Sequence, residues 1–398
     1  MKTCIRLFFS TILFLTLISG VYAFASEMPD CVRVGLEYKY KKVSSVPVSD
    51  KNISFGIEYN GRFLEEGETS SASGFLVSPG NGFFVDVKER YESYQDALYD
   101  CGTYASSGYK AVPSYLGREN WGIFITGFPS ESAANGEASK YGGSVVLASE
   151  FSELSGSTGT VFVSSVNFQI KPGYGSGYIT LGDRSYRGRI EFFISSSSIT
   201  AINVVPLEEY LYSVVPSEMP KSYENEALKA QACAARTYTV SKLGAHSADG
   251  YDVCDGENCQ LYKGVSSEAV STTNAVDSTS GEIIYCGGSP INAVFFSSSG
   301  GYTDNSENVW SAVVSYLKAV SDPYEYDTKV WKRAYSKSDI KDMAIAYGSP
   351  VGNITDMYIS AASNSGRVNE LTITGANGSI KLTKEKIRTF FSFGEGSL

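Results

Sequence analysis

Apolar and polar residues alternate with the two-residue period of β-strands over long stretches of this chain. The pattern predicts strands at Cys31–Leu36 (CVRVGL) and Ile53–Tyr59 (ISFGIEY), and strands also dominate residues 161–205. Residues 357–375 alternate around turn residues and predict a hairpin. Residues 382–391 would follow it as a closing helix or a strand-helix pair. Strands and helices mixed in this order predict an α+β fold.

Residues 81–149 carry a pattern of their own. Strand-like and helix-like segments follow one another there in the order βαββαβ, which is typical of ferredoxin-like domains. We therefore expect an inserted domain at this place. The first, β-rich part of the core would occupy residues 26–80, a Gly/Ser-rich linker residues 150–160, and the main part of the core residues 161–398.

A helix is expected directly after Pro206, a residue that suits the first position of a helix. The apolar residues that follow recur at helical spacing and would face the core. They are Leu207, Tyr210, Leu211 and Val214.

Glu218 is flanked by two prolines, Pro216 and Pro220. Because proline fixes φ near about −65° and lacks an N–H, the pair predicts a stiff bend that interrupts the helix and aims the carboxylate. A second helix should begin next, with Ser222 as its N-cap and Glu224 in its first turn. Taken alone, such an acid is ordinarily a solvated loop carboxylate.

The amino terminus has the layout of a secretory signal. Lys2 and Arg6 precede an apolar run, and Ala-Phe-Ala ends at Ala25. We expect a signal peptide over residues 1–25 that is cleaved after Ala25, with an uncleaved membrane anchor as the alternative. The protein would then be exported to the cell envelope or secreted.

Composition narrows the classes of partner. The 398 residues carry a formal net charge of −10 and show no cluster of Lys and Arg. A phosphate-binding surface needs such a cluster, so nucleic acid is not expected as a partner. The 28 Tyr and 21 Phe give many aromatic rings, which fill cores and also stack on sugar rings.

Several motifs in one order resemble the stage II sporulation protein D family, peptidoglycan lytic transglycosylases related to amidase-enhancer proteins. The resemblance covers most of residues 185–395. The motifs are YRGRIEF (186–192), INVVPLEEYLYSVVPSEMP (202–220), DVCDGENCQLYKG (252–264), FFSSSGGYTDNSENVW (295–310) and SGRVNELTITG (365–375). The inserted segment resembles a sporulation-related repeat (SPOR) domain, a module known for binding glycan strands without stem peptides.

The resemblance implies that Glu218 is the sole catalytic acid and base. Such enzymes cleave the bond between N-acetylmuramic acid and N-acetylglucosamine without water, closing the muramyl C6 hydroxyl onto C1 and leaving a 1,6-anhydro sugar. A hydrolase would instead need a second carboxylate about 5 Å or about 6.5–9.5 Å away. The acids available for that alternative are Asp252, Asp255, Asp304 and Glu307.

The resemblance also implies substrate-binding positions. Gln260 and Tyr262 match the substrate side of the family motif, and ordinary packing is the alternative for both. The motif SSSGGYT combines hydroxyls with glycines that permit positive φ, and a simple tight turn is its alternative. The residues concerned in that motif are Ser299, Gly300, Gly301, Tyr302 and Thr303.

His246, Cys254 and Cys259 form a candidate metal site. An imidazole and two thiolates suit zinc, with a fourth ligand from water or another side chain. Such zinc would be structural, because acid/base catalysis requires no cofactor. A Cys254–Cys259 disulfide is the alternative in an oxidising compartment. Family members often carry His directly before the second Cys, where this chain has Asn258, so the family's metal site is not carried over at that position.

The resemblance implies an exported lytic transglycosylase that acts on peptide-stripped peptidoglycan during engulfment in a spore former. Its implied partners are the glycan strands, an N-acetylmuramoyl-L-alanine amidase that strips stem peptides, and membrane sporulation proteins. Two alternatives stay open: a non-catalytic amidase enhancer, and a glycan-binding envelope protein in which the inserted segment performs all recognition.

Overall fold

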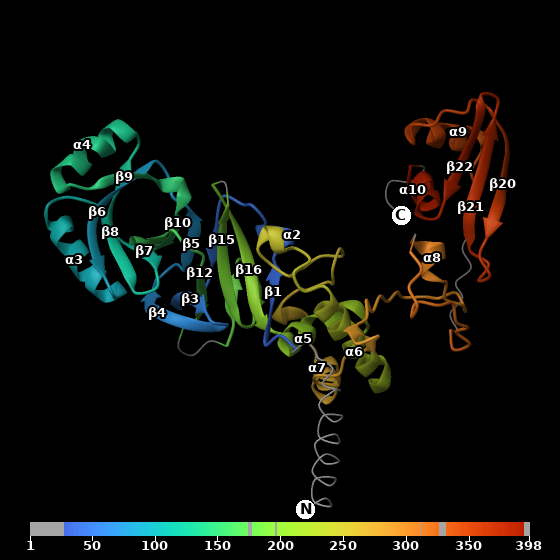
Figure 1. The fold of residues 1–398 in the computed structure, drawn as a ribbon, viewed down its shortest axis with the longest axis horizontal. Coiled ribbons are helices and arrows are strands. Elements are labelled where there is room, and N and C mark those ends of the chain that lie inside the picture. Colours follow the sequence, from blue (N-terminus) through green and yellow to red (C-terminus); the bar gives the residue numbers. More distant parts are fainter. Residues whose placement is uncertain (1–27, 174–176, 196, 311, 326–331, 394–398) are drawn as a thin grey trace, which may run out of the picture. The chain divides into compact units, whose positions relative to one another are not determined.

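The computed structural model describes residues 28–173, 177–195, 197–310, 312–325 and 332–393. The predicted signal peptide, residues 1–25, lies outside them. The chain divides into two compact units, with the boundary between Val294 and Phe295 (Figure 1). In the part of the chain described, no helix combines the length and the apolar character that a membrane crossing requires.

The first unit is built on two sheets (Figure 1). In the sheet that carries the candidate site, β16 (SITAINVVP) is buried along its whole length except at its ends, with β1 and β15 paired antiparallel on its two sides. The strand order is β17 (Val253–Cys254), β1 (Cys31–Gly35), β16 (Ser198–Pro206), β15 (Arg189–Ser195), β12 (Phe168–Pro172), β3 (Asn52–Tyr59) and β4 (Arg62–Ser70).

The second sheet of this unit joins strands from both sides of the predicted insertion. Its order is β14 (Arg184–Tyr186), β13 (Ile179–Leu181), β2 (Val46–Val48), β5 (Phe75–Pro79), β10 (Ser152–Gly156), β11 (Gly159–Ser164), β7 (Ala111–Gly117), β8 (Asn120–Phe128), β6 (Phe83–Tyr91) and β9 (Ser144–Leu147). The unit also contains three short elements: α2 (Glu37–Tyr40), β18 (Tyr285–Cys286) and β19 (Ser289–Pro290). The expected α+β class is confirmed.

The segment from β6 to β9 has the element order β6-α3-β7-β8-α4-β9, with α3 at Tyr94–Ser106 and α4 at Glu131–Tyr141. Both helices begin at serine caps, Ser93 and Ser130, whose hydroxyls accept a backbone N–H. The helices cover one face of the sheet. The other face packs against the chain that follows, through Phe84, Val112, Phe124, Ala148, Phe151 and Val163.

The linker expected at residues 150–160 is instead part of the sheet. β10 and β11 pair in an antiparallel manner, and β11 also pairs with β7 in a parallel manner. Leu154 and Phe162 in these strands are buried. The Ser and Gly residues between the apolar positions led to the prediction of a linker, because a Gly/Ser-rich composition is typical of flexible linkers.

The inserted segment shares its hydrophobic core with the strands around it. Trp121 is 1% exposed, and its ring centroid lies 6.2 Å from that of Phe55 and 5.8 Å from that of Phe162. Glu66 on β4 accepts hydrogen bonds from Trp121 Nε1 at 3.1 Å and from the Tyr115 hydroxyl at 3.2 Å. Residues 81–149 are therefore not packed as a free-standing module.

Three helices follow β16: α5 (Leu207–Glu218), α6 (Asn225–Ser241) and α7 (Val270–Ser278). The expected apolar stripe of α5 is confirmed as buried. The expected break at Pro216 is wrong, since α5 continues through this proline to Glu218. A proline in the last turn removes only one helical N–H, and Met219 N–H closes that turn on the Val215 carbonyl at 2.9 Å.

The start of α6 also differs from expectation. Glu224, not Ser222, is its N-cap, and the helix begins at Asn225. A turn closed by the Tyr223 N–H on the Pro220 carbonyl separates the two helices, which moves the first helical residue later along the chain.

The second unit holds a three-strand antiparallel sheet, β20 (Ile354–Ala362), β21 (Val368–Gly375) and β22 (Gly378–Thr383), with α8 (Ser306–Val309), α9 (Lys337–Ala346) and α10 (Glu385–Ser392). The hairpin predicted at residues 357–375 is confirmed by β20 and β21, and the closing helix by α10. Ile373 and Phe390 belong to its core.

We predict that Trp121→Ala destabilises the first unit as a whole, because it removes a fully buried ring from the shared core. The loss should be about 3–5 kcal/mol. Hydrogen exchange on the full-length chain should show α6 losing protection together with α3 and α4. Tyr99→Ala, which changes an 83% exposed ring on α3, is the matched control. Loss of protection confined to residues 83–147 would contradict a shared core.

Candidate functional site

Glu218 is the last residue of α5, and its side chain is held by a backbone group. Glu218 Oε1 accepts a hydrogen bond from Leu261 N–H at 2.8 Å. The residue is partly buried rather than extended into solvent. The segment 252–264, which contains β17, therefore reaches the end of α5 and fixes one carboxylate oxygen.

A buried ion pair fixes the helix that carries Glu218. Arg236 on α6 is fully buried and binds Glu208, in the first turn of α5, through Nε at 2.9 Å and Nη2 at 2.6 Å. The same guanidinium donates to the carbonyls of Val276 and Glu282 at 3.2 and 3.1 Å. The contact holds α5, α6 and α7 together.

Gln260 and Tyr262 are buried in the first unit. Gln260 Oε1 accepts from the Thr239 hydroxyl at 2.9 Å, and the Tyr262 hydroxyl donates to Asn203 Oδ1 at 2.6 Å. The Tyr262 ring also lies 5.1 Å from that of Tyr210. These contacts fit the packing alternative for both residues, while the residue between them, Leu261, makes the contact with Glu218.

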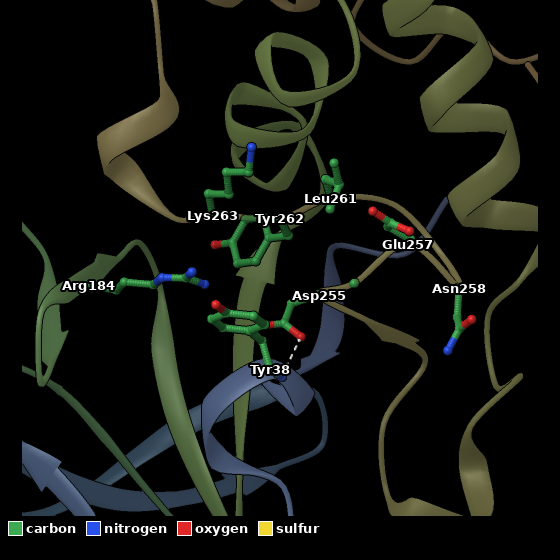
Figure 2. Close-up of a pocket in the computed structure, with 9 residues that line it drawn as sticks. Tyr38, Arg184, Asp255, Glu257, Asn258, Leu261, Tyr262 and Lys263 are labelled. Carbon is green, nitrogen blue, oxygen red and sulfur yellow. Dashed lines mark hydrogen bonds between the residues drawn. The ribbon is translucent and has the colours of Figure 1, made fainter. Parts of the chain in front are cut away.

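A cavity of about 570 Å³ adjoins this segment (Figure 2). Tyr38 on α2 donates its backbone N–H to Asp255 Oδ1 at 3.1 Å. The guanidinium of Arg184, on β14, lies 4.8 Å from the centroid of the Tyr38 ring. The lining residues are Tyr38, Arg184, Asp255, Gly256, Glu257, Asn258, Leu261, Tyr262 and Lys263.

Asp255 forms a buried part of the cavity wall, with 5% of its surface exposed. Burial raises the pKa of its carboxyl to about 6, although the Tyr38 N–H and the charge of Arg184 act in the opposite direction. Sequence reasoning named Asp255 only as a candidate second carboxylate, because burial cannot be seen in the motif itself.

The three candidate metal ligands lie together. One ligand atom from each of His246, Cys254 and Cys259 lies within 4.8 Å of the others, and His246 Nε2 is 3.3 Å from Cys259 Sγ. Tetrahedral zinc with bonds of about 2.0–2.3 Å spaces its ligand atoms by a little under 4 Å, so the set fits zinc. Both cysteines are free thiols, and the hydrogen bond from Cys259 lowers the pKa of Cys254 to about 6.

Glu37 was not predicted as part of this cluster. Glu37, His246 and Asp249 also place one ligand atom each within 4.8 Å of one another. The His246 ring stacks on Tyr251, whose hydroxyl donates to Glu37. Glu37 lies far upstream on α2, and only the pairing of β1 with β17 brings it here, so no local sequence signal could have shown it.

The predicted residues of the SSSGGYT motif lie in the second unit. Gly300 and Gly301 have φ of +64° and +90°, which confirms the expected positive φ. Ser299 N–H and hydroxyl bind Glu325 and Asp322 at 2.7 and 2.8 Å. Arg367 donates to the backbone carbonyls of Ser299 and Tyr302, and the N–H of Thr303 bonds the carbonyl of Val320. These bonds shape a tight turn.

The other acids considered as the second carboxylate of a hydrolase make hydrogen bonds or ion pairs within the protein. Asp252 accepts from the N–H groups of Arg33 and Gly244, both at 3.0 Å. In the second unit, Asp304 accepts from the hydroxyls of Ser363 and Ser365 at 2.7 and 2.9 Å, and Glu307 lies 3.6 Å from Lys318.

Comparison with known proteins identifies the domain that holds this site. Residues 195–285 match the family described as stage II sporulation protein, and residues 304–398 match a domain of unknown function (DUF8618). The first match includes Glu218 and the three candidate metal ligands. The first match ends at residue 285. The core that was expected over residues 161–398 therefore contains matches to two different families.

Three relatives agree with this match. The chain is 37% identical over 175 residues to stage II sporulation protein D of Bacillus subtilis (strain 168), covering 39% of this chain and 51% of that protein. It is 41% identical over 140 residues to stage II sporulation protein D of Bacillus amyloliquefaciens, covering 31% and 41%. It is 39% identical over 140 residues to the amidase enhancer of Bacillus subtilis (strain 168), covering 35% and 19%.

Residues 195–285 are thus a domain of the sporulation protein class that includes these relatives. In this domain the chain is similar to the stage II sporulation protein D of both Bacillus species. The chain spans about half the length of stage II sporulation protein D of Bacillus subtilis, and a smaller share of the other two relatives. The SPOR resemblance of residues 81–149 stays a prediction.

We predict that Asp255→Asn stabilises the protein at pH 7.5 and not at pH 4. The folded-state pKa of about 6 lies above the about 3.9 of an unfolded Asp, so Asp255 lowers stability progressively as the pH rises from 4 through 6. An uncharged amide removes this loss, and the gain at pH 7.5 should be about 1–2 kcal/mol. Thermal unfolding at both pH values measures it.

Asp30→Asn, which removes the charge of an exposed carboxylate, is the control for this measurement. If Asp255→Asn and Asp30→Asn changed the melting temperature equally at both pH values, burial of the Asp255 charge would have no part in the effect.

Proposed function

We propose that this protein is an exported lytic transglycosylase that cleaves the bond between N-acetylmuramic acid and N-acetylglucosamine in peptide-stripped peptidoglycan during sporulation. The observation that carries the proposal is Glu218 itself. It lies in the domain matched to the sporulation family, and its Oε1 accepts a hydrogen bond from the N–H of Leu261, a residue that lines a cavity. The proposed partners are an amidase that strips stem peptides and membrane sporulation proteins.

One carboxyl group can perform both proton transfers. Since Leu261 N–H donates to Oε1, the acidic proton would lie on Oε2 and pass to the glycosidic oxygen as its bond to C1 breaks. The carboxylate left behind would then take the proton of the muramyl C6 hydroxyl as that oxygen attacks C1. The hydrogen bond from Leu261 stabilises the carboxylate between the two transfers.

We also propose that His246, Cys254 and Cys259 hold a structural zinc ion, with the carboxylates of Glu37 and Asp249, which cluster with His246, as candidates for a further ligand. Zinc would link His246 to the loop of Cys254 and Cys259, which directly precedes Leu261, and would take no part in proton transfer. The clustering of the three ligand atoms within 4.8 Å of one another and the short distance between His246 Nε2 and Cys259 Sγ support this proposal.

Glu218→Gln tests the reaction. The amide keeps an oxygen that can accept the Leu261 N–H but cannot donate and recover a proton, so the rate of strand cleavage should fall by about 10²–10⁴. Mass spectrometry of peptide-stripped glycan strands after incubation would show the loss of 1,6-anhydromuramyl ends. The control is Glu226→Gln, which removes an exposed carboxylate at the start of α6.

Two results would reject the proposed reaction. One is continued formation of 1,6-anhydro ends by Glu218→Gln. The other is no cleavage by the unaltered chain together with a higher amidase turnover when the chain is added, which would support the amidase-enhancer alternative.

Cys254→Ser tests the metal site. We expect about one zinc per chain in the unaltered protein, less than a tenth of that in Cys254→Ser, and a lower melting temperature in the variant or after chelation. Elemental analysis and thermal unfolding provide these values. Cys286→Ser, at an exposed cysteine of β18, should retain zinc. A Cys254–Cys259 disulfide in a non-reducing peptide map, without zinc, would refute the proposal.

A further inference from the structure

Tyr38 presents an exposed aromatic ring at the mouth of the cavity. The residue is 71% exposed, yet its backbone is fixed by the hydrogen bond to Asp255. The Arg184 guanidinium stacks near its ring, at 4.8 Å from the centroid. An exposed aromatic ring with a fixed backbone suits the apolar face of a sugar.

Arg184 places a positive charge within the cavity. Figure 2 shows its side chain extending from the sheet toward Tyr38 and Tyr262. Within the described residues, Arg184 forms no ion pair at salt-bridge distance. Asp255, the nearest buried acid, already accepts the Tyr38 N–H. The planar guanidinium therefore keeps donors for a carboxylate ligand, which it can bind through two parallel hydrogen bonds.

Leu261 connects the cavity to the candidate catalytic residue. Leu261 lines the cavity, and its backbone N–H holds Glu218. Glu257, Asn258 and Lys263 add exposed hydrogen-bonding groups around the opening. A sugar bound on Tyr38 would thus lie next to the segment that positions the acid.

We propose that this cavity is a subsite for an N-acetylmuramyl residue, in which Tyr38 stacks on the sugar ring and Arg184 binds the lactyl carboxylate. The inference rests on the proposed function and adds to it a basis for substrate choice. The lactyl group ends in a carboxylate when no stem peptide is attached, and in a neutral amide when one is. Binding of that charge by Arg184 selects strands that an amidase has already processed.

The experiment measures binding, so that it stands apart from cleavage. The protein is the full chain with Glu218→Gln. One ligand is a tetrasaccharide of alternating N-acetylglucosamine and N-acetylmuramic acid with free lactyl carboxylates, and the other is the same tetrasaccharide with these groups converted to methylamides. Calorimetry should show about tenfold tighter binding of the free acid, since a charge-assisted pair at the site is lost in the amide.

Arg184→Gln added to this chain should abolish the preference, leaving both ligands with equal affinity, whereas Arg184→Lys should keep part of it. Tyr38→Ala should weaken both ligands alike. Arg62→Gln, which removes an exposed arginine of β4, is the charge-matched control and should leave the preference unchanged.

The subsite would be refuted if Arg184→Gln kept the tenfold preference, or if it weakened both ligands equally while the chain stayed folded by circular dichroism. A normal preference in a chain that never forms anhydro ends would refute the proposed reaction and leave the subsite standing. If the unaltered chain formed anhydro ends but the Glu218→Gln chain showed no preference between the two ligands, the subsite would be refuted and the proposed reaction would stand.

Discussion

The buried ion pair between Arg236 and Glu208 is the contact on which the geometry of the first unit depends. A guanidinium with no exposed surface cannot lose its carboxylate partner without a cost of about 3–5 kcal/mol, so α5 and α6 are joined as one body. Two further bonds, to the carbonyls of Val276 and Glu282, tie α7 and the chain after it to the same group. α5 leaves the most buried strand of the sheet at Pro206 and ends at Glu218, and this constraint therefore decides where the carboxylate lies.

The segment 252–264 combines three tasks that the sequence keeps within a few residues. Its thiols lie beside His246, its Asp255 forms a wall of the cavity, and its Leu261 N–H reaches Glu218. If the proposed zinc site and sugar subsite are correct, this single backbone segment couples metal binding, sugar recognition and orientation of the Glu218 carboxylate. The side chains of Gln260 and Tyr262, on either side of Leu261, are buried and anchor that segment to the core.

Local periodicity and turn chemistry predicted several elements correctly: the buried stripe of α5, the β20–β21 hairpin and the positive φ of Gly300 and Gly301. Contacts between distant segments could not be predicted in this way. Glu37 reaches His246 only because β1 pairs with β17, and Pro216 is tolerated because packing of α5 outweighs one missing hydrogen bond. Glu218 was named as a candidate from its motif, while the Leu261 N–H that bonds its carboxylate could not be named, since a backbone donor has no signature in sequence.

The covered face of the β6–β9 sheet affects how recognition by this segment could be studied. Phe84 and Phe124 already contact Phe151, and Trp121 lies among Phe55 and Phe162. Excising residues 81–149 would remove Phe84, Phe124 and Trp121 and would expose the rings of Phe55, Phe151 and Phe162. It would also remove β7, one of the two strands that pair with β11. A shortened protein that failed to bind glycan would therefore report a collapsed scaffold as readily as a missing receptor. Only changes on the outer surfaces of α3 and α4 can separate the two explanations.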